Sequence, residues 1–171
     1  MTPDQATAYL AMACQEAQHE QATTRKVLAA VPNDKGDYTP AEKSMTALDL
    51  AWHIASAEVW FFNSIADGSF PHDEGKRPDT VKTPADVVAW YDANFGPALD
   101  RVRNLSGEAA SKIVDFYGII QMPAAAYMQF NVKHTCHHRG QLSVYLRPMG
   151  AKVPSIYGGS ADEPMQMPAT A

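Results

Sequence analysis

The sequence predicts an all-α protein, a four-helix bundle with long crossover connections, on three observations. Four long segments have helix-favouring composition and apolar residues at helical spacing. Stretches rich in proline and glycine separate these segments and predict where the helices end. The chain has 171 residues, of which 46% are hydrophobic and 19% charged, so we expect a single packed domain over residues 1–171. Helices of roughly 20 residues are about 30 Å long, and their apolar stripes must face one another.

The first two helices are predicted from their start signals and from the turns that follow them. We expect the first helix over residues 3–30, because Thr2 can cap it and proline at position 3 is favoured in the first turn. It must end before Pro32, since the residue before a proline disfavours helical backbone. The second helix is expected over residues 44–66, where an Asp-Gly pair ends it.

The third helix follows a long polar loop and is predicted to open at Thr83, which can cap it ahead of Pro84. The helical pattern continues to about residue 105, but we expect Pro97 to kink or break it midway, because proline cannot donate the helical hydrogen bond. Residues 112–121 are rich in strand-favouring side chains and are predicted to be an extended connector.

The fourth helix is expected over residues 123–149 and is closed by a glycine. From about residue 151 the chain contains proline, glycine and serine and is predicted to be an irregular C-terminal tail. The two long connections, over residues 31–43 and 67–83, allow crossovers between helices, so simple up-down-up-down wiring is not implied.

Charge and cysteine content exclude several classes of function. The chain has 14 basic and 19 acidic residues, a net charge of −5, and no dense run of lysine or arginine, so we expect no nucleic-acid partner. Its two cysteines lack CxxC spacing, which favours a reducing cytoplasm over a disulfide-rich scaffold. No secretory signal is apparent and no run approaches the roughly 20 apolar residues of a membrane span. The sequence therefore predicts a cytoplasmic protein without a membrane partner.

Two histidines of the fourth helix, His134 and His138, are spaced to share one face. Side chains at i and i+4 can direct their nitrogens to one divalent ion, which is the geometric content of the zinc-protease HExxH motif. That motif itself is absent here. His137 could pair with His134 instead, but the i, i+4 pair is better centred on the apolar stripe. Cys136 falls on the opposite face and is predicted to pack rather than to bind metal.

A third ligand is expected from the second helix, where His53 lies in the middle of a largely apolar stripe. Three neutral imidazoles from two helices would form a cation site with open positions, and burying them without partners would be costly. Asp49, one turn earlier, could orient the His53 ring or serve as a further ligand. A competing site, the ExxH pair of Glu16 and His19, has no second ExxH to match it, so these residues and Glu20 are predicted to be mainly solvated.

The faces that carry the histidines also predict a substrate pocket, which would suit a small organic electrophile. Its expected members are Trp60, Tyr127, Gln141, Tyr145 and, from the tail, Tyr157. An equally consistent interpretation makes the aromatic members core residues. The fourth helix also has a second apolar stripe, which predicts burial against another element or a second subunit; it consists of Met128, Val132, Cys136 and Leu146. No dinucleotide, P-loop or α/β-hydrolase motif is present.

The sequence resembles the DinB-like (YfiT-type) metalloprotein family of damage-inducible bundles. The resemblance rests on His53 in an LxxHIxxxExW-like context, on TRKVLAAVP near the end of the first helix, and on the block HTCHHRGQLSVYLRPMGAKVPSIYG, and it covers residues 10–160. It implies a four-helix bundle with up-up-down-down wiring and one divalent metal ion, most often nickel or zinc, held by His53, His134 and His138. It also implies a homodimer.

Enzymatic members of this family include bacillithiol- and mycothiol-dependent transferases and a thiol-dependent maleylpyruvate isomerase, while many members have no assigned reaction. The resemblance therefore implies a metalloenzyme that transfers a low-molecular-weight thiol to a small electrophile. A metal-dependent hydrolase and a non-catalytic stress protein that binds metal and a small ligand remain the alternatives.

Overall fold

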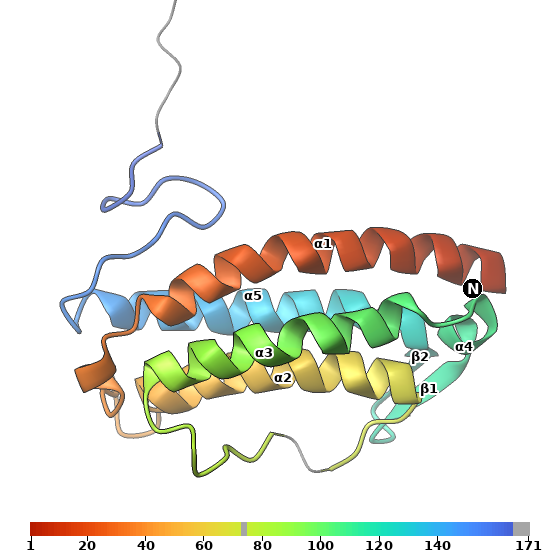
Figure 1. The fold of residues 1–171 in the computed structure, drawn as a ribbon, viewed down its shortest axis with the longest axis horizontal. Helices are drawn as coiled ribbons and strands as arrows, with labels where there is room; N and C mark the ends of the chain where they lie inside the picture. Colours follow the sequence, from red (N-terminus) through yellow and green to blue (C-terminus); the bar gives the residue numbers. More distant parts are fainter. Residues whose placement is uncertain (73–74, 166–171) are drawn as a thin grey trace, which may run out of the picture.

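The computed structural model describes residues 1–72 and 75–165, which are mostly helical as predicted. Four long helices lie side by side along the long axis of the molecule (Figure 1). They are α1 (Pro3–Ala29), α2 (Ala47–Asp67), α3 (Pro84–Arg103) and α5 (Tyr127–Leu146). Shorter elements occupy the connections: η1 (Asn33–Lys35), α4 (Gly107–Ser111), β1 (Ile113–Phe116), β2 (Ile120–Pro123) and η2 (Ala124–Ala126). None of the described helices is long and apolar enough to cross a membrane.

The directions of the helices differ from the expected up-up-down-down order. In Figure 1, α1 and α5 run one way while α2 and α3 run the other, which gives the order down-up-up-down. Helices α2 and α3 are parallel and contact each other at their C-terminal ends, where Arg101 of α3 donates a hydrogen bond to Asp67 of α2. The reason lies in the connections. The chain between α1 and α2 turns back at one end of the bundle, whereas residues 68–72 and 75–83 lie along its outside, before α3 begins (Figure 1).

Helix caps lie where the sequence predicts them, with one shift. The Thr2 and Thr83 hydroxyls accept hydrogen bonds from the backbone N–H groups at N3, and in both helices the N3 side chain completes a capping box. Helix α2 starts at Ala47 rather than at residue 44, because Thr46 is the residue that caps it, accepting from Asp49 N. Gly68 closes α2 at a positive φ of 68°.

The expectation that Pro97 kinks or breaks the third helix is wrong in its stronger form, because α3 is one helix with Pro97 inside it. Proline removes one helical hydrogen bond and leaves the carbonyl four residues earlier, that of Ala93, without its usual donor. Both Pro97 and Ala93 are exposed. The freed carbonyl therefore lies on the solvent side of the helix, where water can replace the missing donor.

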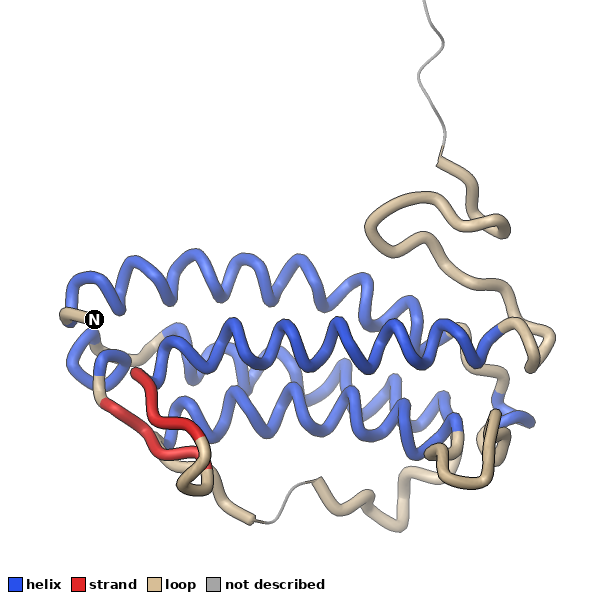
Figure 2. Tube along the Cα trace, turned by 180° about the vertical axis from the view of Figure 1, so that it is seen from behind, coloured by secondary structure: helices blue, strands red, loops and turns tan. Residues whose placement is uncertain are grey.

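The predicted extended connector is a β-hairpin. Strands β1 and β2 pair antiparallel, with Phe116 opposite Ile120. Tyr117 and Gly118 turn the chain at positive φ values of 57° and 72°, a backbone shape suited to a tight hairpin turn. Figure 2 shows the hairpin at the end of the bundle where α1 begins, while the chain after α5 leaves from the opposite end.

A polar network lies inside the bundle on the side of α5 that faces α1. The Arg139 guanidinium is 1% exposed and donates to Glu20 Oε2 at 2.6 Å and to Thr24 Oγ1 at 3.0 Å. Across the core, Tyr91 of α3 donates to the buried Glu58 carboxylate of α2 at 2.7 Å. The expectation that Glu20 is solvated is wrong, because the periodicity of α1 alone does not reveal that α5 presents an arginine to it.

The second apolar stripe of α5 is covered within the chain at its ends. Met128 and Leu146 are fully buried, and they lie on the same side of the helix as Arg139, which contacts α1. Val132 and Cys136 are half-buried. The burial of Met128 and Leu146 is therefore achieved within one chain and does not require a second subunit.

Candidate metal centre

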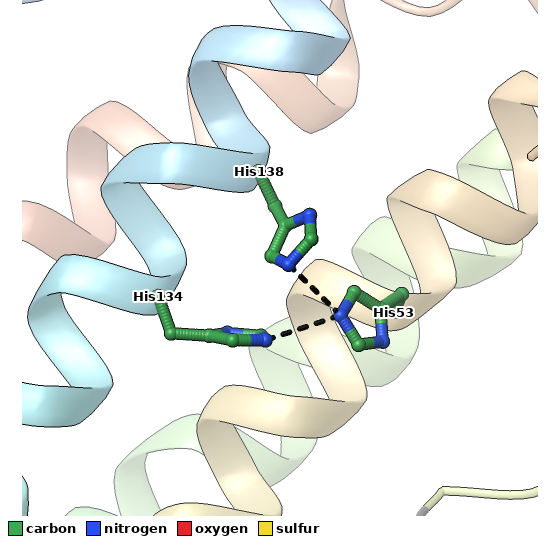
Figure 3. A group of neighbouring side chains, drawn as sticks. All are labelled: His53, His134 and His138. Carbon is green, nitrogen blue, oxygen red and sulfur yellow. Dashed lines mark hydrogen bonds between the residues drawn. The ribbon is translucent and has the colours of Figure 1, made fainter. Parts of the chain in front are cut away.

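Three histidine rings converge between α2 and α5 (Figure 3). His53 Nε2 lies 3.1 Å from His134 Nε2 and 3.3 Å from His138 Nε2. The three ligand atoms all lie within 4.8 Å of one another. Among the described residues, this is the one group of three or more His, Cys, Asp or Glu side chains close enough to hold a metal ion.

The helices explain why these rings meet. His134 and His138 are four residues apart on α5 and therefore lie about 40° apart around its axis. Helix α2 packs antiparallel on the same face, as the contact of Tyr145 near the end of α5 with Met45 just before α2 indicates. His53, near the start of α2, therefore lies at the same height along the bundle axis as His134 and His138 on α5.

The spacing of the three nitrogens fits a metal ion. A tetrahedral ion bound to imidazole at about 2.1 Å holds its nitrogens about 3.4 Å apart. The two closest separations here, 3.1 and 3.3 Å, are near that value. The site therefore offers three ligands in a geometry that leaves further coordination positions for a small molecule.

The surroundings keep the three rings neutral, which is the form that binds metal. The pKa of His134 is lowered from 6.5 to about 3, chiefly by burial and further by the neighbouring imidazoles. The pKa values of His53 and His138 are also lowered, in both cases chiefly by burial. Protonation would place positive charges next to one another in a partly buried site. At neutral pH the three rings are therefore neutral, and each has a nitrogen lone pair that can bind a metal ion.

Gln141, one of the predicted pocket residues, contacts the triad directly. Its Oε1 lies 2.8 Å from His138 Nδ1, one turn along α5. Asp49, the predicted partner of the His53 ring, is instead engaged at the start of α2, where it accepts from Thr46 Oγ1 at 2.7 Å and pairs with Arg77. Gln141 is thus positioned to orient the His138 ring, whereas the contacts of Asp49 are with Thr46 and Arg77 and not with the His53 ring that it was expected to orient.

The competing ligand candidates lie apart from the triad. The His137 ring is exposed and approaches His138 with its centroid 4.8 Å away, but it is not part of the group that can hold an ion. Glu16 and His19 are exposed on α1. In the part of the chain that the structure describes, neither belongs to a cluster of metal-binding side chains.

An aromatic cavity of about 250 Å³ lies beside His53 and His134. Trp60, which the sequence places in the pocket, lines it. The remaining aromatic walls are Trp52, Phe61, Phe116 and Phe130. Phe130 lies on α5, one turn before His134, whereas Phe116 comes from the hairpin, and no pattern in the sequence indicates that the hairpin folds over this cavity.

A second, more open groove of about 490 Å³ lies beside His138. Gln141 and Tyr145, both predicted pocket residues, line it. The rest of its wall comes from the loop before α2 and from neighbouring positions of α2 and α5, namely Pro40, Lys43, Ser44, Met45, Leu50 and Val144. The single expected pocket is thus divided into two spaces by the triad.

The other two predicted pocket residues have different contacts. Tyr127 is fully buried, and its hydroxyl donates to the carbonyls of Val114 and Ile120 at 3.0 Å each, which ties the hairpin to α5. The Tyr157 hydroxyl lies 2.8 Å from Glu20 Oε2 and also contacts Arg139, on the α1 side of α5. In the described structure both hydroxyls thus serve contacts away from the triad.

Comparisons with known proteins agree with this architecture. The sequence model of the DinB family matches residues 5–168. Two uncharacterised Bacillus subtilis proteins are similar in sequence: YrdA is 27% identical over 146 residues, 84% of this chain and 85% of YrdA, and YjoA is 29% identical over 129 residues, 74% of this chain and 82% of YjoA.

Solved structures share the fold. The DinB-like YjoA of Bacillus subtilis superposes with a TM-score of 0.70 and 24% identity over 85% of this chain and 97% of its own. A DinB-like protein from Bacillus cereus also gives 0.70, with 23% identity over 84% and 94%. A mycothiol-dependent maleylpyruvate isomerase gives 0.57 at 13% identity over 86% of this chain and 65% of its own. Because the family model covers nearly the whole chain, this protein belongs to the DinB family.

Proposed function

We propose that this protein is a divalent-metal-binding enzyme that transfers a low-molecular-weight thiol to small electrophiles. The observation that carries the proposal is the convergence of three imidazole nitrogens, from His53, His134 and His138, beside an aromatic cavity. Nickel and zinc are the metals we expect, since imidazole ligands suit both. When bound, such an ion lowers the pKa of a coordinated thiol and supplies thiolate at neutral pH.

The residues around the triad support the proposed chemistry in distinct ways. Gln141 holds the His138 ring so that Nε2 faces the other two histidines. The aromatic walls contributed by Trp60, Phe61 and Phe116 limit the access of water to the reacting groups. Transfer forms a bond between the thiol sulfur and an electrophilic carbon. The displaced group, or the adjacent atom in an addition, takes up the thiol proton.

A structural neighbour supports the choice of thiol chemistry over other metal chemistry. The mycothiol-dependent maleylpyruvate isomerase shares this fold at a TM-score of 0.57, and its name states a thiol dependence. A metal-dependent hydrolase is the second candidate, because a site with three histidine ligands and a free position is also the arrangement of zinc enzymes that activate water. A metal- and ligand-binding protein without turnover is the third.

The remaining partner and location proposals rest on the sequence. We propose a small-molecule substrate, no nucleic-acid partner, a homodimer and a cytoplasmic location. The excess of acidic over basic residues supports the absence of a nucleic-acid partner. The two free cysteines, Cys14 and Cys136, support the cytoplasmic location.

The test has two stages. The chain is first purified without chelators or a histidine tag, and its metal content is measured by elemental mass spectrometry. The loaded protein is then screened for saturable consumption of thiols with small electrophiles, beside hydrolysis of esters and amides. Thiol transfer that is lost in His53→Ala and kept in His137→Ala supports the proposal. Hydrolysis alone would favour the second candidate, and metal binding without any turnover the third.

A further inference from the structure

The histidine triad separates two spaces with different chemistry. His53 and His134 line the aromatic cavity, and His138 lines the groove on the other side. Among the described residues, the two spaces have no lining residue in common. A molecule in one space and a molecule in the other would therefore both reach the triad without competing for the same walls.

The aromatic cavity suits an uncharged, flat ligand. Phe61 and Phe116 lie stacked with an interplanar angle of 6°, and Phe61 also lies 5.6 Å from the His134 ring, centroid to centroid. No carboxylate, ammonium or guanidinium group of the described chain lines this space. Since a cavity of about 150 Å³ suffices for benzene, the volume here, about 250 Å³, accepts a substituted arene or a comparable unsaturated molecule.

The groove beside His138 has a different character. It is wider, about 490 Å³, and it combines an ammonium group, a hydroxyl and an amide from Lys43, Ser44 and Gln141 with apolar walls from Met45 and Val144. These groups suit a flexible, polar molecule. Lys43 is exposed on the rim and offers a positive charge to an anionic group. Neither a carboxylate nor a further cation lines the groove among the described residues, so Lys43 sets its charge.

We infer that the two spaces are separate sites for the two substrates, which rests on the proposed thiol transfer. The aromatic cavity binds the uncharged, unsaturated electrophile, and the groove binds a thiol that carries a carboxylate, with its sulfur toward His138 and its carboxylate toward Lys43. Both substrates bind at the same time, on either side of the triad.

The groove is tested with a pair of thiols on the metal-loaded full chain, by calorimetric titration. N-acetylcysteine carries a carboxylate, and N-acetylcysteamine is a comparable thiol without one. We expect Lys43→Ala to weaken N-acetylcysteine binding about fivefold, the scale of an exposed ion pair, and to leave N-acetylcysteamine unchanged. Lys133→Ala, on an exposed position of α5 outside the groove, is the matched control and leaves both affinities unchanged. Equal losses for the two thiols in Lys43→Ala would overturn the carboxylate assignment.

The cavity is tested with fluorobenzene, followed by fluorine NMR. Ala57 lines the cavity from a half-buried position, so Ala57→Leu fills the space without opening the core. We expect it to weaken fluorobenzene binding at least tenfold while N-acetylcysteine binding and the melting temperature stay near wild type. In the wild type, saturating N-acetylcysteine leaves fluorobenzene bound. Displacement of one probe by the other would mean a shared site and would overturn the inference.

The two proposals fail in distinguishable ways. The fluorobenzene titration is repeated on metal-free protein. The weaker binding in Ala57→Leu must persist there, because fluorobenzene contacts the aromatic walls of the cavity and does not need the metal ion to bind. A chain that binds both probes together but never turns them over contradicts the proposed function and leaves the two-site inference standing. Thiol transfer by a chain that binds only one probe at a time supports the proposed function and contradicts the two-site inference.

Discussion

The His138 Nδ1 atom lies 2.8 Å from Gln141 Oε1, one helical turn further along α5. An amide oxygen can only accept a hydrogen bond, so this contact favours the tautomer of His138 that carries its proton on Nδ1. The lone pair is then on Nε2, the atom that lies 3.3 Å from His53 Nε2. A single neutral side chain thus fixes both the orientation of the ring and the nitrogen that is free to bind metal.

The first prediction follows from this contact. Gln141→Leu removes the acceptor, so we expect metal affinity to fall by about 10- to 100-fold, the range typical of lost orienting partners. Affinity is measured by competition with a chromophoric chelator. Asp49→Asn is the control, because Asp49 is engaged with Thr46 and Arg77 and should leave the affinity unchanged. A larger loss in Asp49→Asn than in Gln141→Leu would reverse the two roles.

The second prediction concerns the ligands. His53→Ala, His134→Ala and His138→Ala should each remove most of the bound metal, since a site with three protein ligands cannot readily lose one. His137→Ala should keep near-stoichiometric metal, because its ring is exposed and outside the triad. Elemental analysis of the four variants decides. Loss of metal in His137→Ala together with retention in His138→Ala would show that the ligand pair on α5 has been assigned wrongly.

The parts of the site that sequence could predict depend on periodicity within one helix. The spacing of His134 and His138 is sufficient to place them on one face, and the apolar setting of His53 marks it as inward-facing. The positions of Thr2 and Thr83 as helix caps follow from equally local rules. For these residues the neighbouring sequence contains the physical cause of the structure.

The features that sequence could not predict depend on contacts between elements. Glu20 is buried because Arg139 reaches it from another helix, and Phe116 lines the aromatic cavity because the hairpin folds over it. Asp49 was a reasonable partner for His53 by spacing, yet Arg77 and Thr46 engage it first. The helix order differs for the same reason, since the placement of residues 68–72 and 75–83 along the outside of the bundle (Figure 1) depends on packing and not on local pattern.

The third prediction concerns assembly. The family resemblance predicts a homodimer, and light scattering at micromolar concentration should give about twice the chain mass of 18.6 kDa. Because Met128 and Leu146 are already buried within one chain, the interface must use another surface. Leu146→Ala should therefore lower the melting temperature and leave the mass of the particle unchanged. Dissociation of folded Leu146→Ala to monomers would contradict this assignment of the stripe.

The fourth prediction concerns pH. Burial raises the pKa of Glu58 from 4.5 to about 7, although the hydrogen bond from Tyr91 and the charge of Arg139 oppose the rise and Glu20 adds to it. Between these two pH values the native state keeps the proton that the unfolded chain loses. The free energy of unfolding therefore falls as pH rises from 4.5 to about 7, by roughly 3 kcal/mol in total.

Glu58→Gln should abolish this part of the pH dependence, because the amide oxygen can still accept from Tyr91 and cannot ionise. Urea unfolding at pH 5 and pH 8 measures the effect, and the variant should be more stable than wild type at pH 8. Glu16→Gln, at an exposed position of α1, is the control and should keep the wild-type difference between the two pH values. An unchanged pH difference in Glu58→Gln would exclude Glu58 as its source.

The last prediction concerns the buried ion pair between α1 and α5. Arg139→Met leaves the Glu20 carboxylate, whose side chain is 12% exposed, without the guanidinium that lies 2.6 Å from it. Breaking a buried pair on one side costs about 3–5 kcal/mol, whereas replacing both charges with apolar groups is often neutral. We therefore expect Arg139→Met to destabilise the protein strongly and the double variant Arg139→Met/Glu20→Leu to recover most of the lost free energy of unfolding, as measured by urea unfolding.

Arg25→Met is the control for this prediction. It breaks an ion pair with Asp92 whose side chains are 48% and 37% exposed, and it should cost less than about 1 kcal/mol. Metal content should stay at the wild-type level in every folded variant, because Arg139 points toward α1 and not toward the triad. A double variant no more stable than Arg139→Met would mean that the hydrogen bond to Thr24, rather than the charge pair, accounts for the stability.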